Sequence, residues 1–271
     1  MRRRGGAALP GSRGAAAPRL ARGRALTIPW QLELGEPFDA WNSELVAPAL
    51  RADGTEVVVK VRLPDDAESE HEAEALDFWG GHGAVRLLAH DPDRRALLLE
   101  RCRPGTPLGT EYDDEQIAVA ATLMQRLWRP PPPEVPWRRL EDVAARWQRE
   151  LPRRYEGLLV EAALDALEAL LGTQDELVLC HQDLHGGNIL RAEREPWLAI
   201  DPKPIVAERA YDAVALIRDA QPTLGELRRR LDLLAELLDL DRERIRLWGL
   251  VKSLAWDDPE EARLFAEVGS R

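Results

Sequence analysis

Long apolar runs and cysteines are both scarce in this chain of 271 residues. No stretch of about 18 uncharged apolar residues occurs, so the sequence predicts no membrane-spanning helix. Cys102 and Cys180 are the only cysteines, too few for a disulfide framework or a four-cysteine zinc site, and we expect two buried, reduced thiols. The first 25 residues lack the apolar core of a secretion signal, which favours a cytoplasmic protein.

Lysine and asparagine are also rare. The chain has 34 arginines but only three lysines, Lys60, Lys203 and Lys252, and its only asparagines are Asn42 and Asn188. Whatever bias shaped the composition disfavours both residue types. Each lysine and asparagine that is present therefore calls for its own explanation.

Acidic side chains outnumber basic ones, and the excess is unevenly spread. The formal net charge is −11, yet residues 1–25 hold seven arginines and no acid, so residues 26–271 carry 30 basic and 48 acidic groups, a balance of −18. A protein with this excess of negative charge repels nucleic acid and attracts a cationic partner. For residues 1–25 the composition favours a disordered extension, with an organelle transit sequence as the alternative.

The segment 26–103 has the pattern of an antiparallel sheet with one helix. A hairpin signal, Asp53-Gly54, separates two of its apolar runs, and a second turn signal lies at 91–93. A helix is expected after Pro64 and is stopped by Gly80. The five predicted strands are 32–38, 44–51, 55–61, 85–90 and 96–101.

Residues 104–271 have mainly helical periodicity and form the second predicted domain. The predicted helices are 113–128, 140–151, 155–171, 208–220, 224–239 and 242–256. A short β segment interrupts them at 177–181, 189–191 and 197–200. The polar residues in the loops of this β segment are the first candidates for a functional site.

The strongest chemical signal is the sequence CHQDLHGGNIL at residues 180–190. It places His181 and Asp183 after an apolar strand, and Asn188 five residues after the aspartate. Transfer of a phosphoryl group to an alcohol needs a carboxylate that positions the hydroxyl and accepts its proton, and an amide oxygen on Mg²⁺. A loop with this spacing supplies both groups.

A second carboxylate follows at Asp201, where the apolar run 197–200 ends, and it is the expected second metal ligand. The alternative is that Asp183 and Asp201 are turn-forming aspartates and that His181 is a core histidine with satisfied hydrogen bonds. For any single one of these residues, the structural interpretation is as good as the catalytic one. The complete ordered set, with one of the two asparagines at 188, favours phosphoryl transfer.

Lys60 interrupts the apolar run 57–61 on a predicted strand, where a cation must be paired or used. The α and β phosphates of a nucleotide are natural partners. Glu72, in the helix that follows, is the expected partner that holds the lysine, ahead of Glu70 and Glu74, which fall off its face. The alternative is an edge-strand lysine that points to solvent beside an ordinary acidic helix surface.

Together these residues resemble a known family. The frame of the eukaryotic-like protein kinases matches Lys60, Glu72, His181, Asp183, Asn188 and Asp201. The motif His-x-Asp-Leu-His-x-Gly-Asn at 181–188 is similar to the aminoglycoside phosphotransferase branch. Further segments resemble the aminoglycoside and hydroxyurea phosphotransferases, the group that contains streptomycin 6-kinases: Gly83–Leu88, Leu98–Arg101, Pro104–Leu108, Arg194–Pro204 and Tyr211-Asp212.

The resemblance implies an α+β, bilobal kinase-like fold, with a small antiparallel β lobe at 26–103 and a larger helical lobe at 104–271. It implies ATP and Mg²⁺ as cofactors, with Asp183 as catalytic base and Lys60 as phosphate clamp. The other implied roles are Glu72 as the partner of that lysine, Asn188 and Asp201 as Mg²⁺ ligands, backbone groups of Glu100 and Cys102 against the adenine edge, and His181 and Asp212 as supports of the catalytic loop.

The chain departs from a protein kinase at residues 39–43, at Gln182, where a protein kinase has arginine, and after Asp201. Between the first two strands, residues 39–43 contain no glycine, so the phosphate contacts expected of a glycine-rich loop fall to Asn42 and Ser43. Asp201 is followed by Pro-Lys-Pro, and only a few residues separate it from the next helix, which leaves no activation loop or peptide platform. The acceptor is therefore expected to be a small molecule.

These observations predict an ATP- and Mg²⁺-dependent phosphotransferase that acts on a hydroxyl of a small cationic acceptor, with an aminoglycoside such as streptomycin as the leading candidate. One alternative is a metabolic kinase of the same fold that acts on an amino-alcohol or a sugar. The other is a nucleotide-binding pseudokinase, against which the complete set Lys60, Asp183, Asn188 and Asp201 argues.

Overall fold

The computed structural model describes residues 30–38, 45–109, 111, 113–174, 176–217 and 222–269, and the chain divides into two compact units. The first unit comprises the described residues up to Asp66 together with Leu87–Arg101, and the second comprises Ala67–Arg86 and the described residues from Cys102 onward. The predicted extension 1–25 lies outside the described residues, and the predicted domain boundaries stay a prediction.

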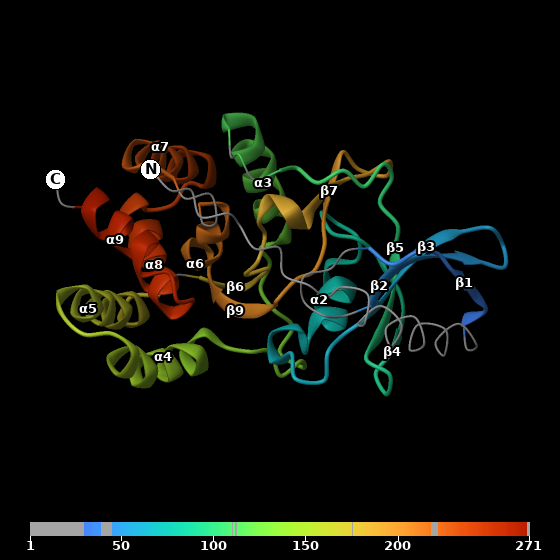
Figure 1. Ribbon diagram of the computed structural model, residues 1–271, viewed down its shortest axis with the longest axis horizontal. Helices are drawn as coiled ribbons and strands as arrows, with labels where there is room; N and C mark the ends of the chain where they lie inside the picture. Colours follow the sequence, from blue (N-terminus) through green and yellow to red (C-terminus); the bar gives the residue numbers. More distant parts are fainter. Residues whose placement is uncertain are drawn as a thin grey trace, which may run out of the picture. The chain divides into compact units, whose positions relative to one another are not determined.

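A five-stranded antiparallel sheet forms the first unit, in the order β1-β2-β3-β5-β4 (Figure 1, blue to teal). Antiparallel strands are joined at both predicted turns, 53–54 and 91–93. The strands are β1 (Leu32–Leu34), β2 (Leu45–Arg51), β3 (Glu56–Val61), β4 (Leu87–Asp91) and β5 (Ala96–Glu100). β1 ends earlier than predicted because Pro48, the residue of β2 opposite Gly35, accepts from the Gly35 N–H but has no N–H to donate in return. Pro37 also lacks an N–H, and Phe38 donates to Val46 instead.

Local sequence explains the β2–β3 hairpin and the core beneath it. Gly54 has φ +83°, a left-handed conformation that glycine adopts without strain, and the Thr55 N–H donates to the Asp53 carboxylate. Alternate residues of β3, Val57 and Val59 among them, enter the core of the sheet. Lys60 directly follows Val59 on the strand, so its side chain points to the opposite face of the sheet.

Helices dominate the second unit. They are α2 (Glu72–Trp79), α3 (Asp114–Leu127), α4 (Leu140–Arg154), α5 (Leu158–Gly172), α6 (Arg209–Ala213), α7 (Leu224–Leu238), α8 (Arg242–Ala255) and α9 (Pro259–Val268), with 3₁₀ turns η1 (Ala67–Ser69), η2 (Gly186–Asn188) and η3 (Val214–Leu216). α8 (Figure 1, red) has many buried residues and contacts α5, α7 and α9. No helix of the described ranges is both long and apolar enough to cross a membrane.

Two short antiparallel ladders sit among these helices: β6 (Leu177–Cys180) with β9 (Ile205–Glu208), and β7 (Ile189–Arg191) with β8 (Trp197–Ala199). β9 and α9 were not predicted. The expected helix 208–220 is shorter, because β9 takes up Glu208, and α6 passes into η3. An N-terminal antiparallel sheet followed by a mainly helical part is the α+β kinase-like class that the sequence predicts, and that prediction is confirmed.

Candidate active site

The predicted catalytic loop joins β6 to β7. β6 ends at Cys180, a buried thiol whose pKa is well above its ordinary value because burial disfavours the thiolate. Loop residues 181–185 follow, then η2, and β7 begins at Ile189. The segment 106–109 runs beside β7, with the Leu108 N–H donating to Ile189 and the Arg191 N–H donating to Thr106. Both ends of the loop are therefore fixed by backbone hydrogen bonds.

Asp212 anchors the beginning of this loop from α6. Its Oδ1 accepts a hydrogen bond from the Gln182 N–H at 2.7 Å, and its Oδ2 accepts from the His181 N–H at 3.1 Å and from Trp128 Nε1 at 2.9 Å. The carboxylate is fully buried, and this burial raises its pKa against the opposing effect of the three donors and Lys252. Asp212 thus holds two consecutive peptide N–H groups directly before Asp183.

His181 ties the loop to the segment that follows β8. Its Nε2 lies 3.0 Å from the Ile200 carbonyl oxygen, and its own carbonyl accepts from the Lys203 N–H at 3.0 Å. The ring stacks on Trp79, with centroids 6.0 Å apart and planes 8° from parallel. Burial lowers the pKa of His181 from 6.5 to about 3, so the imidazole is neutral and donates from Nε2. His181 thus contacts Ile200, Lys203 and Trp79, and its role as a support of the catalytic loop stays a prediction.

Asp183 and Asn188 lie in contact. Asn188 Nδ2 donates to the Asp183 carbonyl at 2.8 Å and to Asp183 Oδ2 at 3.2 Å. These bonds engage the amide nitrogen of Asn188 and orient its amide oxygen for another ligand. The Asn188 side chain is buried, while about a quarter of the Asp183 side chain is exposed. The carboxylate is thus accessible to a substrate, while the amide is fixed.

Asp201 follows β8, and Asn188 directly precedes β7, so both residues lie at the end of the β7–β8 hairpin that is opposite its turn. The Ile200 N–H donates to the Asn188 carbonyl at 2.9 Å, which brings the two predicted metal ligands to one end of the hairpin. Asp201 has φ +54°, a conformation that a non-glycine residue adopts at a cost. Lys203 Nζ lies 3.3 Å from Asp201 Oδ1 and also donates to the Ser69 hydroxyl.

These residues fit a magnesium ion of the kind that kinases use with ATP. One carboxylate and one amide oxygen are hard ligands, and Mg²⁺ typically takes only one or two protein carboxylates and completes its shell with water and phosphate oxygens. Within the described residues no group of three or more His, Cys, Asp or Glu side chains is placed to hold a metal.

The other predicted site residues lie on β3, on α2 and around the end of β5. Lys60 is buried on β3, opposite Val46 and Leu97, and Glu72 is fully buried at the first position of α2. Glu100 ends β5, and Cys102 is a buried free thiol. Their nucleotide-binding roles stay predictions. Asn42 and Ser43 lie outside the described residues.

Sequence reasoning missed two residues of this site. The sequence singled out Lys203 only for the rarity of lysine, yet its ammonium group lies 3.3 Å from Asp201 Oδ1. His185 was part of the motif without a role, and its ring lies near the Asp183 carboxylate. Rarity could have identified the lysine. The position of the histidine depends on a turn geometry that the sequence does not reveal.

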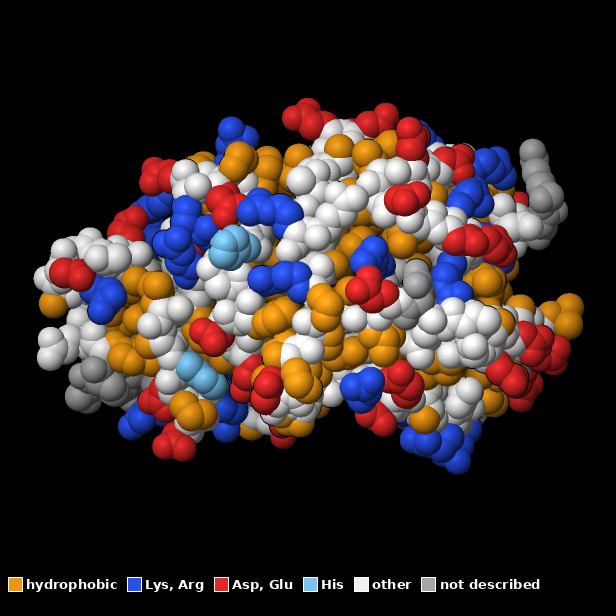
Figure 2. Space-filling model, turned by 180° about the vertical axis from the view of Figure 1, so that it is seen from behind, with side chains coloured by type: hydrophobic (Ala, Val, Ile, Leu, Met, Phe, Trp, Pro, Cys, Tyr) orange, Lys and Arg blue, Asp and Glu red, His pale blue; other side chains and the backbone are white. Residues whose placement is uncertain are grey.

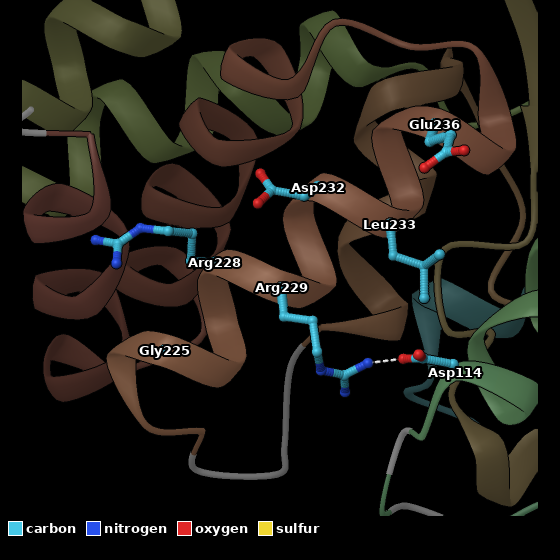
Figure 3. A pocket seen from close by; sticks show the side chains of 7 residues that line it. All are labelled: Asp114, Gly225, Arg228, Arg229, Asp232, Leu233 and Glu236. Atoms are coloured by element: carbon cyan, nitrogen blue, oxygen red, sulfur yellow. Dashed lines mark hydrogen bonds and ion pairs between the residues drawn. The ribbon is translucent and has the colours of Figure 1, made fainter.

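A cavity of about 410 Å³ opens elsewhere, between α7 and the start of α3 (Figure 3). Arg229 of α7 points across it toward Asp114 of α3 and forms an ion pair, while Arg228 points away. Asp232, paired with Arg242, and Glu236 complete its charged lining. None of the predicted site residues lines this cavity, and we assign it no part in catalysis.

Comparisons with known proteins show which family the chain belongs to. Residues 30–259 match the family described as aminoglycoside/hydroxyurea antibiotic resistance kinase. A streptomycin 6-kinase of Streptomyces glaucescens is 37% identical over 246 residues, covering 84% of this chain and 79% of the relative. A hydroxyurea phosphotransferase of Kitasatospora aureofaciens is 38% identical, covering 84% of this chain and 70% of the relative.

Among solved structures, the choline kinase LicA of Streptococcus pneumoniae has the same fold, with a TM-score of 0.63 and 14% identity over 93% of this chain and 92% of that one. Most of the chain matches the family, and the curated relatives exceed one third identity over most of both lengths. The chain therefore belongs to the aminoglycoside/hydroxyurea antibiotic resistance kinases, phosphotransferases that use ATP and act on small molecules.

Proposed function

We propose that this protein transfers the γ-phosphate of ATP to a hydroxyl group of an aminoglycoside, with streptomycin as the first candidate. The observation that carries the proposal is the loop in which Asp212 holds the backbone before Asp183 while Asn188 contacts the same aspartate. The 37% identity to a streptomycin 6-kinase supports the choice of acceptor. Consumption of ATP favours the cytoplasm as the place of action.

In this reaction the acceptor oxygen attacks the γ-phosphorus in line, and a new P–O bond forms as the bond to the β–γ bridging oxygen breaks. ADP leaves with that oxygen. Asp183 orients the hydroxyl and takes its proton, and Lys60 neutralises phosphate charge. Catalysis comes mainly from positioning and charge stabilisation, because phosphoryl transfer leaves the protein little covalent chemistry.

Asn188 and Asp201 are the residues that would hold Mg²⁺, through an amide oxygen and a carboxylate oxygen. A bound Mg²⁺ would neutralise charge on the phosphate oxygens. Lys203 keeps one oxygen of Asp201 engaged at 3.3 Å and so restrains the carboxylate.

A cationic acceptor suits the charge of the chain. Residues 26–271 carry the −18 balance. Acidic and basic side chains are nevertheless interspersed on the face drawn in Figure 2, so the excess does not gather there into one acidic patch. The net charge supports a preference for cationic acceptors in general. The choice of an aminoglycoside among them rests on the relatives.

The second candidate acceptor is hydroxyurea, favoured by the 38% identity to a hydroxyurea phosphotransferase. Hydroxyurea is small and neutral, whereas streptomycin is a large cation. An amino-alcohol or sugar kinase is the remaining enzymatic alternative.

An assay of ADP release with purified protein tests the proposal. Streptomycin, hydroxyurea, choline and a neutral sugar are each supplied with ATP and Mg²⁺, and the product is identified by mass. We expect turnover with streptomycin and a loss of at least about 100-fold in Asp183→Asn, because positioned acid–base groups contribute about 10² to 10⁴. Turnover confined to an uncharged acceptor would transfer the assignment to that compound, and turnover with none would refute it.

Two further measurements separate the parts of the proposal. Asn188→Ala and Asp201→Asn should each raise the Mg²⁺ concentration that gives half-maximal rate, and unchanged titrations in both would place the metal elsewhere. The KM for a cationic acceptor should rise with KCl, because salt screens exposed charges beyond about 8 Å at 0.15 M. The KM for a neutral acceptor, measured in the same buffers, is the control.

A further inference from the structure

His185 has a fixed tautomer. Its Nδ1 accepts a hydrogen bond from the Gly187 N–H at 3.1 Å, so that nitrogen carries a lone pair and the proton of the neutral ring resides on Nε2. This bond also makes His185 the cap of η2. The ring therefore presents an N–H group on the side away from its own backbone.

That N–H group faces the proposed catalytic base. His185 Nε2 lies 3.8 Å from Asp183 Oδ2, the oxygen that also accepts from Asn188 Nδ2 at 3.2 Å. At 3.8 Å the histidine makes no full hydrogen bond, but catalytic contacts are commonly long before substrate binds. Both side chains are about a quarter exposed, so a molecule from solution can reach both of them.

The two glycines after His185 make this arrangement possible. A Cβ atom at Gly187 would lie 2.8 Å from His185 Cε1 and 3.0 Å from Nδ1, so a larger residue would push the ring aside. A Cβ at Gly186 would lie only 1.6 Å from the Gly109 carbonyl oxygen. Gly186 thus keeps the turn against the neighbouring segment, and Gly187 leaves room for the ring.

We propose that His185 is a positioning residue for phosphoryl transfer, whose Nε2–H, with the Asn188 amide, holds one oxygen of Asp183 and so orients the carboxylate toward the acceptor hydroxyl. The proposal rests on the function proposed above. Loss of the His185 side chain should lower kcat and leave ATP binding unchanged.

A set of variants separates this role from that of a turn cap. In His185→Asn the side-chain oxygen still accepts from the Gly187 N–H, as asparagine commonly does two residues ahead, but no N–H reaches Asp183. In His185→Ala both contacts are lost. Gly187→Ala keeps the histidine and displaces its ring.

We expect His185→Asn to melt within about 2 °C of the wild type, with an unchanged KM for ATP and kcat lowered about ten-fold. Gly187→Ala should lower kcat similarly, and the double variant should resemble His185→Asn alone because both changes remove one contact. A purely structural histidine would leave His185→Asn with wild-type kcat, and that result overturns the proposal. Additive losses in the double variant would also overturn it.

A readout that needs no acceptor keeps this test apart from that of the proposed function. Long-range proton–nitrogen NMR resolves the ring nitrogens of the five histidines, and the signals of His185 are those absent from His185→Asn. A protonated Nε2 whose resonance shifts in Asp183→Ala supports the contact. An Nε2 resonance that does not shift in Asp183→Ala overturns the proposed contact between His185 and Asp183. This result can be read even if no aminoglycoside is phosphorylated.

Discussion

At the scale of single residues, Asp212 is the group on which the loop depends. A buried carboxylate normally costs free energy, and the raised pKa of Asp212 reflects that cost. The cost is offset because the side chain accepts from two backbone N–H groups and an indole N–H that would otherwise be buried without partners. The residue connects the backbone of the catalytic loop to α3 and α6.

We expect Asp212→Asn to lower the free energy of unfolding by about 2–3 kcal/mol, because the amide keeps one acceptor oxygen and turns an NH₂ group toward N–H donors. Loosening of the loop should reduce kcat by about 10- to 100-fold with little change in KM for ATP. Urea unfolding and steady-state kinetics measure both effects.

The matched control is Trp128→Phe, which removes one donor at 2.9 Å and leaves the carboxylate and both backbone bonds in place. Its kcat should fall less than about three-fold, at a stability cost of about 1–2 kcal/mol. An Asp212→Asn variant with wild-type kcat would show that the loop needs no such anchor.

At the scale of elements, α8 and α9 pack closely together at a glycine of α8. Gly249 lies inside α8, and a Cβ atom there would come within 2.1 Å of the Phe265 ring of α9. Phe265 is fully buried, so the ring has no room to move away. Glycine is a poor helix former, and its presence in the middle of α8 is explained by this packing.

Gly249→Ala should therefore destabilise the protein by about 1–3 kcal/mol, the usual cost of overpacking, although alanine favours a helix. Gly225 in α7 has nothing within 4 Å of the corresponding position, and Gly225→Ala should instead stabilise by up to about 1 kcal/mol. Thermal and urea unfolding of the two variants measure whether each change lowers or raises the free energy of unfolding. Equal effects at both positions would contradict the packing explanation.

The sequence predicted most elements but not their long-range contacts. The strands of the sheet and most helices follow from local apolar periodicity and turn signals. β9 was missed because its pairing with β6, such as Cys180 with Ile205, joins residues far apart in the sequence. α9 is short, with acidic residues in its first turn, and its apolar face becomes evident only from its packing against α8, α7 and α5.

At the scale of the whole molecule, the site combines predictable and unpredictable parts. Asp183, Asn188 and Asp201 could be singled out because phosphoryl transfer restricts residue types and spacing. The contact of Asp212 with Trp128 joins residues 84 positions apart, and no local pattern encodes it. The contact of His185 with Asp183 is close in sequence but depends on the turn at Gly187.

One consequence for the whole fold is a pH dependence of stability. His181 is fully buried and neutral, and its pKa falls from 6.5 to about 3 on folding. The unfolded chain therefore binds a proton that the folded chain excludes. The contribution of this residue is complete above pH 6.5 and is lost progressively as the pH falls toward 3.

Between pH 7.5 and 5.0 the expected loss is about 2 kcal/mol of unfolding free energy, since each pH unit below 6.5 costs about 1.4 kcal/mol. His181→Gln retains a donor for the Ile200 carbonyl and has no titrating ring. The wild type should therefore lose about 2 kcal/mol relative to this variant over that range, measured by urea unfolding at each pH. Between pH 7.5 and 8.5, where an imidazole with either pKa is neutral, the difference between the two proteins should stay constant. A difference that is also constant down to pH 5.0 would mean that His181 takes up its proton in the folded protein as readily as in the unfolded chain.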